Sequence, residues 1–309
     1  MGKNDNTLVK NASFLMVAAL ISKIIGLIYK SPLSATLGNE SFGCFSFAQN
    51  VYFILLMIAS FSIPQAVSKI MAERIAFKRY RDAQRIFKGA LLYAVVVGGV
   101  VAVFCVVGAP LLIPDSMANA RLALQFLAPT IFFSGILGVF RGYFQAYRNM
   151  LPTSLSQIAE QIAVAVVALV MANVMVRHFA DAPTDTLRSW SAAGATMGTG
   201  AGVLTALLFM LFVYSVNRKT IQKKIARDVK SVDESYRSVM KNIVLIVSPI
   251  ILSAFLYNVN TYINSRIYSS VSGFRGLDSN LIESLYAECG YFMTLINIPL
   301  TLASTARTG

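Results

Sequence analysis

The sequence predicts an all-α, polytopic membrane protein with about eight transmembrane helices. Two observations support this fold class. Of the 309 residues, 56% are hydrophobic and only 13% are charged, whereas soluble domains contain about 25% charged residues. The hydrophobic residues also gather in runs of about 20 or more, the length that a helix needs to cross the roughly 30 Å hydrocarbon core of a bilayer.

Each predicted helix is bounded by residues that disfavour a regular helix. We expect Ser31 and Pro32 to end the first span, Pro110 to follow the third, and Pro152 to open the fifth, because proline is excluded from helix interiors. The first hydrophobic stretch lacks a cleavage site, so we expect a retained helix and not a signal peptide. The eight spans are expected at 11–30, 42–67, 85–109, 121–145, 152–176, 191–216, 241–265 and 284–305.

The longest polar segment divides the chain into two unequal parts. Residues 217–240 form a basic linker between a six-helix N-terminal lobe, 1–216, and the start of a second lobe, 241–309, with two helices. Basic residues crowd this linker and the 68–88 loop, while 31–41 has none. The positive-inside rule therefore places the N-terminus and both basic segments in the cytoplasm, with the chain in the cell membrane. Because six plus two helices is lopsided, we expect the sequence to be truncated at its C-terminus.

Composition and spacing argue against several other classes. The net charge of +13 could suggest a nucleic-acid partner, but the basic residues lie in loops between spans, so we expect no nucleic acid. Three scattered cysteines are too few for a disulfide framework or a zinc site. The acidic residues are dispersed and the single histidine has no partner, so we predict no enzyme activity, cofactor or metal.

A lysine lies deep inside the first predicted span. Lys23 follows about a dozen span residues, or about 18 Å at 1.5 Å per residue, and is too deep for easy snorkelling to the cytoplasm. Charged residues at this depth usually face a bundle interior or a wet cavity. We predict that Lys23 meets an anionic substrate group, although an ion pair would also explain it. Lys30 lies on nearly the same face and is more easily explained by snorkelling.

A basic hinge joins the fourth and fifth predicted spans. Arg141 lies at the end of the fourth span, and its planar guanidinium is suited to gripping phosphate. Glu160 lies about 12 Å into the fifth span, where a carboxylate should pair with a cation or have a raised pKa. Two hypotheses remain open for Glu160: a structural ion pair with Arg141 and a role in proton or cation coupling.

Polar residues also form stripes along three predicted spans. Asn50, Gln157 and Asn260 are the members that we expect to contact substrate hydroxyls. Such stripes can line a cavity or can hydrogen-bond neighbouring helices. The stripe of Asn50 also contains Ser46, Phe53, Ser60 and Pro64. The stripe of Gln157 also contains Ser156 and Gln161. The stripe of Asn260 also contains Ser253, Tyr257 and Asn264.

Three glycines share one face of the fourth predicted span. Gly135, Gly138 and Gly142 recur at helical spacing, and small residues in such a row let a second helix approach closely. We predict a packing role for this row. Pro64 is expected to bend the second span or to mark its end.

Four motifs together resemble a known family of membrane transporters. They are Ile63 to Lys69 (IPQAVSK), Arg141 to Gln145 (RGYFQ), the 152–161 segment with Ser156, Gln157 and Glu160, and Leu295 to Pro299 (LINIP). In this order, they resemble the polysaccharide-transport branch of the multidrug/oligosaccharidyl-lipid/polysaccharide (MOP) exporter superfamily. The resemblance is to the stage V sporulation protein B type, which is related to the lipid II flippases.

The resemblance implies a fold and a function. It implies two six-helix lobes around a central cavity and alternating-access movement of undecaprenyl-pyrophosphate-linked oligosaccharides across the cytoplasmic membrane. Lys23 stands where such flippases place a cationic residue. The implied partners are the lipid-linked oligosaccharide, membrane lipid and envelope-synthesis enzymes. Two departures concern ion coupling: Val164 stands where members often have arginine, and Asn260 or Asn264 where they commonly have aspartate.

Three other functions stay open from the sequence. A cation-coupled multidrug antiporter of the same superfamily would have an acid-rich cavity. The charged residues predicted deep inside the spans of this sequence are mostly basic. A membrane-embedded enzyme of envelope synthesis would change its lipid-linked substrate covalently. A scaffold for other envelope enzymes would tolerate loss of Lys23 and Arg141.

Overall fold

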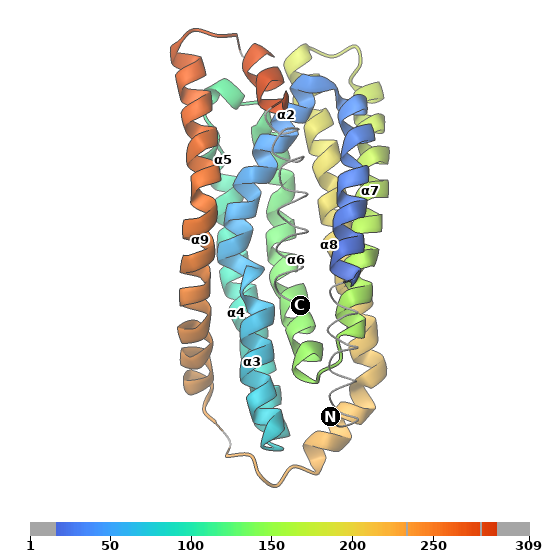
Figure 1. Ribbon diagram of the computed structural model, residues 1–309, viewed down its shortest axis with the longest axis vertical. Coiled ribbons are helices and arrows are strands. Elements are labelled where there is room, and N and C mark those ends of the chain that lie inside the picture. The colour runs from blue at the N-terminus through green and yellow to red at the C-terminus, as the bar shows by residue number, and fades with distance from the viewer. Residues whose placement is uncertain (1–16, 233, 279, 289–309) are drawn as a thin grey trace.

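The computed structural model describes residues 17–232, 234–278 and 280–288. Within these ranges the regular secondary structure is helical, and six helical stretches are long and apolar enough to cross a membrane. The first of them, Val17–Ala76, contains two of the predicted spans. Figure 1 shows the helices lying side by side along one long axis. The all-α, polytopic class predicted from the sequence is therefore confirmed.

The first chain reversal lies later than the sequence predicted. Residues 17–28 are helical and lead through Tyr29 into α2 (Lys30–Leu56), so Ser31 and Pro32 do not end the span. Pro32 falls in the first turn of α2, where backbone N–H groups have few helical acceptors and proline is tolerated. The chain reverses inside α2 at Gly38, which has a φ of 72° and a ψ of 166°. Glycine adopts this backbone conformation without steric cost.

The second span continues beyond its predicted end. A π-helical turn, η1 (Met57–Phe61), follows α2 and leads into α3 (Ile63–Ala76). Pro64 lies at the start of α3, so it marks a junction within the span and not its end. The extra residue of a π-turn accommodates the backbone hydrogen bonds that a helix loses near proline.

The glycine row of the fourth span packs against this junction. A Cβ atom on Gly142 would lie only 2.7 Å from the backbone oxygen of Pro64, and one on Gly138 would lie 3.3 Å from the Pro64 side chain. The fourth span, α6 (Ala120–Ala146), therefore approaches the start of α3 to backbone distance. This contact confirms the packing role predicted for the glycines.

The remaining helices follow the predicted order, with bounds that mostly extend the predicted ones. The sixth span begins at Thr184 and continues as one helix through the first ten residues of the expected linker. The elements are α4 (Tyr80–Val107), α5 (Ala109–Leu112), η2 (Asp115–Met117), α7 (Leu151–His178), α8 (Thr184–Ala226) and α9 (Tyr236–Phe274).

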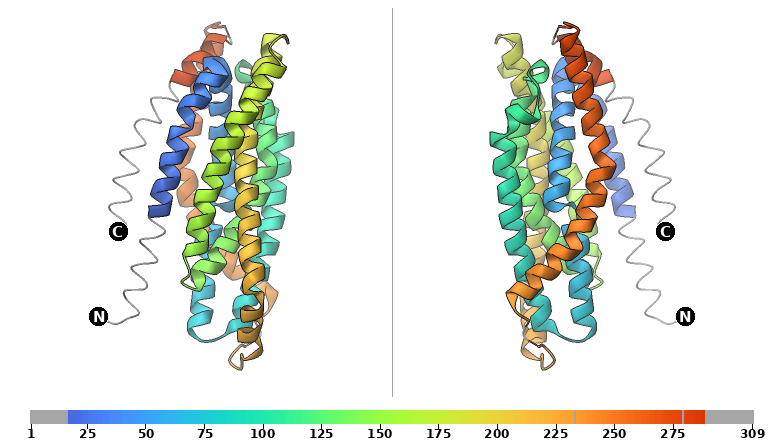
Figure 2. Two further views of the ribbon diagram at one scale, coloured as in Figure 1. Left: turned by 90° about the vertical axis from the view of Figure 1, so that its right-hand side faces the viewer. Right: turned by 90° about the vertical axis from the view of Figure 1, so that its left-hand side faces the viewer.

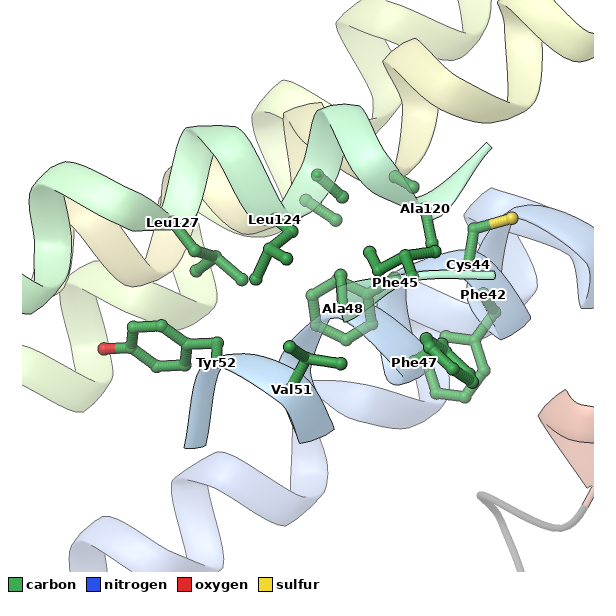
Figure 3. Close-up of a cluster of buried hydrophobic side chains, with 14 of the residues drawn as sticks. Phe42, Cys44, Phe45, Phe47, Ala48, Val51, Tyr52, Ala120, Leu124 and Leu127 are labelled. Atoms are coloured by element: carbon green, nitrogen blue, oxygen red, sulfur yellow. The ribbon is translucent and has the colours of Figure 1, made fainter. Parts of the chain in front are cut away.

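The buried side chains form two clusters stacked along the bundle. One cluster joins α2, α6, α7 and α8 toward the Gly38 end, and Figure 3 shows Phe45, Val51 and Leu124 packing together there. The other joins α3, α4, α6 and α8 with the start of α9. Because lipid is as apolar as these side chains, their packing stabilises the bundle mainly through close van der Waals contact.

The two basic segments lie at the same end of the bundle. The turn at 77–79, between α3 and α4, and the 227–235 segment, between α8 and α9, meet at the bottom of Figure 1. We call this the basic end and the other, near Gly38, the opposite end. Residues 280–288 are helical and begin the eighth predicted span; the rest of that span and the Leu295 to Pro299 motif lie outside the described residues.

Candidate functional site

Arg141 and Glu160 form an ion pair between α6 and α7. The guanidinium Nη2 atom of Arg141 lies 2.6 Å from Oε2 of Glu160, and its Nε–H donates to the hydroxyl of Ser156 at 3.0 Å. Ser156 in turn donates to the backbone oxygen of Thr153 at 2.7 Å. The two charged side chains are only 15% and 18% exposed. The structure thus contains the ion pair across the hinge that one of the two hypotheses for Glu160 describes, and the role of Glu160 in coupling stays a hypothesis.

Close helix packing fixes both partners of this pair. Arg141 precedes Gly142, which seats α6 against α3. Glu160 lies where α8 crosses α7: a Cβ atom on Gly202 would overlap the side chain of Val164 and lie 2.8 Å from the Glu160 backbone oxygen. The absence of a side chain at Gly202 therefore allows the close approach that holds Glu160 in place.

The hydrogen bonds of Arg141 leave part of its guanidinium available. Arginine has five N–H donors, and its bonds to the described residues use Nε and Nη2. A phosphate oxygen could approach the remaining donors, or displace the Glu160 carboxylate from the shared face. Phosphate and Glu160 are both anions, so they compete for the same cation.

Gln157 lies one turn before Glu160 on the same helix. It is half-buried, and its Oε1 atom is buried without a hydrogen-bond partner in the described part of the chain. A buried amide oxygen without a donor costs about 1–3 kcal/mol. Its carbonyl group is therefore ready to accept a hydrogen bond from a ligand hydroxyl or from water.

Lys23 lies on the helix that packs against this part of α7. A Cβ atom on Gly26, one turn after Lys23, would lie 3.1 Å from Oε1 of Gln161. Both helices run from the basic end toward the opposite end (Figure 1), so Lys23 lies about level with Gln157, one turn before Gln161. The Lys23 side chain is exposed and makes no ion pair with the described residues.

Asn50 and Asn260 lie on α2 and α9, and no hydrogen bond or ion pair joins either of them to the Arg141–Glu160 pair among the described residues. The amide Nδ2 of Asn50 donates to the hydroxyl of Tyr286 at 2.7 Å, and Tyr286 also shares a 2.8 Å hydrogen bond with Ser265. Asn50 thus joins α2 to the helical segment 280–288. Asn260 is exposed on α9. Contact of these two side chains with substrate remains a prediction.

Two cavities can be described, and neither contains Lys23 or Arg141. One of about 480 Å³ lies at the basic end and is lined by Phe77, Arg79 and Lys230. The other, of about 230 Å³, lies between α2 and α9 and has an apolar lining that includes Ile58 and Tyr262. A water-filled vestibule beside Lys23 therefore remains a prediction.

A second ionic cluster, which the sequence analysis missed, lies at the opposite end. Arg188 of α8 is only 4% exposed and lies 2.6 Å from Glu40 and 3.5 Å from the buried carboxylate of Glu283. Asn119 donates to Glu283 at 3.0 Å and to Asp185 at 3.1 Å. The predicted spans 152–176 and 191–216 left Arg188 in the loop between them. One signal for burial of Arg188 was available in the sequence. Arg188 lies just before the small residues Ser191 to Ala195, in the first turns of the α8 helix.

At the basic end, two buried aspartates attach the 227–235 segment to the start of α4. Asp228 accepts hydrogen bonds from the backbone N–H groups of Arg81 at 2.7 Å and Lys230 at 2.8 Å. Asp82 accepts from the backbone N–H groups of Val232 and Glu234, at 3.0 and 3.1 Å. Each aspartate thus accepts hydrogen bonds from the backbone of the other segment, and the 227–235 segment is docked on the first turn of α4.

Hydrogen bonds control the charge state of Asp228. Burial by itself raises the pKa of this carboxyl group, but hydrogen bonds from the Ser231 hydroxyl and from backbone N–H groups favour the carboxylate. The net effect lowers the pKa of Asp228 to about 2. Asp228 is therefore ionised throughout the physiological pH range, and its carboxylate can accept the hydrogen bonds of Arg81 and Lys230 over that range.

Comparison with solved structures assigns the bundle to a class of membrane transporter folds. The chain is similar to a structure described as the inward-facing conformation of a multidrug resistance MATE family transporter of the MOP superfamily. The TM-score is 0.68 at 14% sequence identity, and the match covers 90% of this chain and 59% of the other. The protein therefore has the fold of this superfamily.

The sequence identifies the family within that class. Residues 8–297 match the polysaccharide biosynthesis protein family, and the chain belongs to it. Stage V sporulation protein B of Bacillus subtilis (strain 168) is 24% identical over 98% of this chain and 57% of its own length. Lipid II flippase MurJ of the same organism is 21% identical over 97% of this chain and 56% of its own length. The chain thus spans about half the length of these relatives.

Proposed function

We propose that the protein is a flippase that moves a lipid-linked cell-envelope oligosaccharide, carried on undecaprenyl pyrophosphate, across the cytoplasmic membrane by alternating access. The observation that supports this most is the arginine inside the bundle, Arg141, which lies near the level of the exposed Lys23. Family membership and the likeness to a relative named as a lipid II flippase support the same proposal.

Arg141 and Lys23 would engage the pyrophosphate, and polar side chains would contact the sugars. The guanidinium of Arg141 would exchange Glu160 for a phosphate oxygen, because both anions bind the same donors. Gln157 would accept a hydrogen bond from a sugar hydroxyl through its free amide oxygen. Asn260 would add a second polar surface on α9. Asn50 would do so only after release from Tyr286.

The distribution of basic residues supports a cytoplasmic location of the basic end. Lysine and arginine are frequent in the 68–88 stretch around the turn at 77–79 and in the 217–240 stretch around the 227–235 segment. The two connections lie together at that end, as the positive-inside rule expects of cytoplasmic loops. The N-terminus then also lies inside. The two lobes would rock around a central cavity that opens to either side in turn.

Membrane potential would supply the driving force. Moving one negative charge outward through an inside-negative potential of 100 mV is downhill by about 2.3 kcal/mol. Two charges on the pyrophosphate would give about 4.6 kcal/mol. Export would therefore need no bound ion, and Glu160 would act as the structural partner of Arg141.

The proposal is tested by leaflet transfer of a fluorescent lipid-linked oligosaccharide in vesicles containing the complete protein with both lobes. Arg141→Ala and Lys23→Ala should each slow transfer at least tenfold, because each removes a cation that the pyrophosphate would meet. Arg148→Asn is the matched control: it removes an exposed guanidinium seven residues from Arg141 at a left-handed position, φ 58°, which asparagine tolerates. Normal transfer in both alanine variants would contradict the proposal and favour a scaffold.

The same vesicles separate the other candidate functions. An envelope-synthesis enzyme would alter the lipid-linked oligosaccharide covalently, which mass spectrometry of the recovered lipid detects. A multidrug antiporter would move a cationic dye against a proton or sodium gradient. Covalent change of the lipid without leaflet transfer would favour an enzyme over a flippase. Dye transport without leaflet transfer would favour an antiporter.

A further inference from the structure

Three separate stretches of chain meet in the Arg188 cluster at the opposite end of the bundle. Glu40 lies just after the chain reversal at Gly38, Arg188 lies in α8, and Glu283 lies beyond α9 in the helical segment 280–288. Figures 1 and 2 show this last segment at the top of the bundle, beside the upper end of α2. The cluster therefore joins the six-helix lobe to the segment that follows the linker.

The segment 280–288 lies directly on α2 beside this cluster. A Cβ atom on Gly43 would overlap the backbone oxygen of Glu283, so the two backbones are in contact. One turn along, the ring of Tyr286 packs 5.2 Å from that of Phe47, and its hydroxyl bonds Asn50. Cys44 follows Gly43 on α2 and is fully buried next to this contact. These contacts close the bundle at this end.

The chemistry of the cluster suits a contact that opens and closes. Glu283 is fully buried and depends on Arg188 and Asn119 for its hydrogen bonds. Removing one partner of a buried pair is strongly destabilising, because the other charge stays buried and unpaired. Separating both partners into water costs far less, because water replaces each hydrogen bond. A closely packed apolar contact would gain no such compensation from water.

The basic end is joined by two kinds of contact. There backbone N–H groups bond to Asp82 and Asp228, and Arg74 and Arg79 form ion pairs with Glu234 at 2.8 and 2.7 Å. These contacts connect the 227–235 segment to the end of α3 and to the first turn of α4. At the opposite end, the ion pairs of Arg188 join α8 to α2 and to the segment 280–288.

We propose that Arg188, Glu40 and Glu283 form a lock on the opposite end of the bundle, and that separation of Glu283 from Arg188 opens this end to the outside. This role rests on the proposed alternating-access function and assigns the residues that close its outer side. In the closed state, the hydrogen bond to Tyr286 holds the Asn50 side chain. When the lock opens, this amide becomes available to contact the substrate.

The native Cys44 reports whether the lock is closed. It is fully buried beside the cluster, and Cys105→Ser with Cys289→Ser leaves it as the single cysteine. In this background, Arg188→Ala and the milder Glu40→Gln should each raise the rate of Cys44 labelling by a membrane-impermeant maleimide at least tenfold. Asp115→Asn is the control, because it removes an exposed carboxylate paired with Arg121 at the same end. Parental labelling rates in folded Arg188→Ala and Glu40→Gln would overturn the lock.

A cross-link tests whether the lock must open during transport. Glu283→Cys places a second thiol beside Cys44, and oxidation should lower leaflet transfer at least tenfold, with recovery in reductant. The matched control, Glu283→Cys with Cys44→Ser, lacks the carboxylate but cannot form the cross-link and should be unaffected by oxidant. Unchanged transfer by protein shown by mass to be cross-linked would overturn the proposal.

The two measurements keep the lock separate from the proposed function. If no lipid-linked oligosaccharide moves in either redox state, the proposed function fails. The labelling rates of Cys44 then still decide whether Arg188 and Glu40 close this end.

Discussion

At the scale of single residues, the structure is organised by buried charges that are paired. Arg141 pairs with Glu160 between α6 and α7, and Arg188 pairs with Glu40 and Glu283 at the opposite end. Inside a helical bundle, an unpaired charge is far more costly than in water. Removal of either partner should therefore destabilise the fold, because the other charge stays buried without its counter-ion.

This coupling predicts a rescue at the Arg141 pair. Arg141→Ala leaves Glu160 largely buried without its cation and should lower the free energy of unfolding by about 3 kcal/mol. Adding Glu160→Gln removes the stranded charge and should restore most of that loss. Thermal unfolding of the single and double variants in detergent measures the effect. Equal instability of the two would show that the charges are not coupled.

The depressed pKa of Asp228 predicts how stability depends on pH. The native carboxyl titrates near 2, below the value of about 3.9 in an unfolded chain, so its contribution is complete above about pH 4 and is lost as pH falls through about 2. Asp228→Asn should therefore lower the melting temperature at pH 5 to 7, and the difference from the parent should shrink toward pH 2. A loss of melting temperature that is the same at every pH would show that the Asp228 charge is not its cause. Asp115→Asn is the control: its site is exposed, so its melting temperature should differ little from that of the parent at any pH.

At the scale of elements, glycine determines how closely the helices approach. Gly142 seats α6 on α3, and Gly198 and Gly202 seat α8 on α7. A Cβ atom on Gly198 would lie 2.6 Å from the backbone nitrogen of Ala168. Such contacts bring polar side chains of neighbouring helices within hydrogen-bond range.

Substitution of these glycines should separate the effects of packing and helix propensity. Gly202→Ala should destabilise by about 1–3 kcal/mol, because the added methyl group overlaps Val164 and overpacks the interface. Gly99→Ala is the control: its Cβ atom would meet only the Phe132 ring, at 4.0 Å, so the gain in helix propensity of about 0.5–1 kcal/mol should prevail. Chemical unfolding of both variants checks the prediction. Similar effects in the two variants would refute the role given to close packing.

The sequence predicted the helices better than their ends. Seven of the predicted spans correspond to helices, because the length and polarity of an apolar run are visible locally. The reversal at Gly38 was missed because Pro32 was interpreted as a helix end, although the first turn of a helix tolerates proline. The Arg141 pair was predictable because its members lie on helices joined by a short hinge.

The Arg188 cluster and the docked 227–235 segment were not predictable. Glu40, Arg188 and Glu283 are separated by about a hundred residues or more, and no local pattern indicates which acid meets which base. The part that Asp82 and Asp228 play in attaching the 227–235 segment was not predictable either, because their partners are backbone N–H groups, which every residue type except proline carries. Contact between distant segments depends on the packing of the whole bundle, which a single sequence does not display.

At the scale of the whole molecule, polar contacts close both ends of the bundle. The basic end is joined by backbone hydrogen bonds to buried aspartates and by ion pairs of Glu234, and the opposite end by the ion pairs of Arg188. Arg141 lies between these ends, and its bonds to the described residues use only two of its three guanidinium nitrogens. The proposed flippase would open the opposite end, while the basic end keeps the segments attached.

Leaflet transfer of pyrophosphate-linked oligosaccharide in vesicles under an imposed membrane potential tests the flippase proposal most sharply. With an inside-negative potential of 100 mV, we expect net outward movement, favoured by about 4.6 kcal/mol over the field-free distribution, and its loss in Arg141→Ala. Transfer no faster than in protein-free vesicles, or equal with and without the potential, would show that the protein is not a potential-driven flippase.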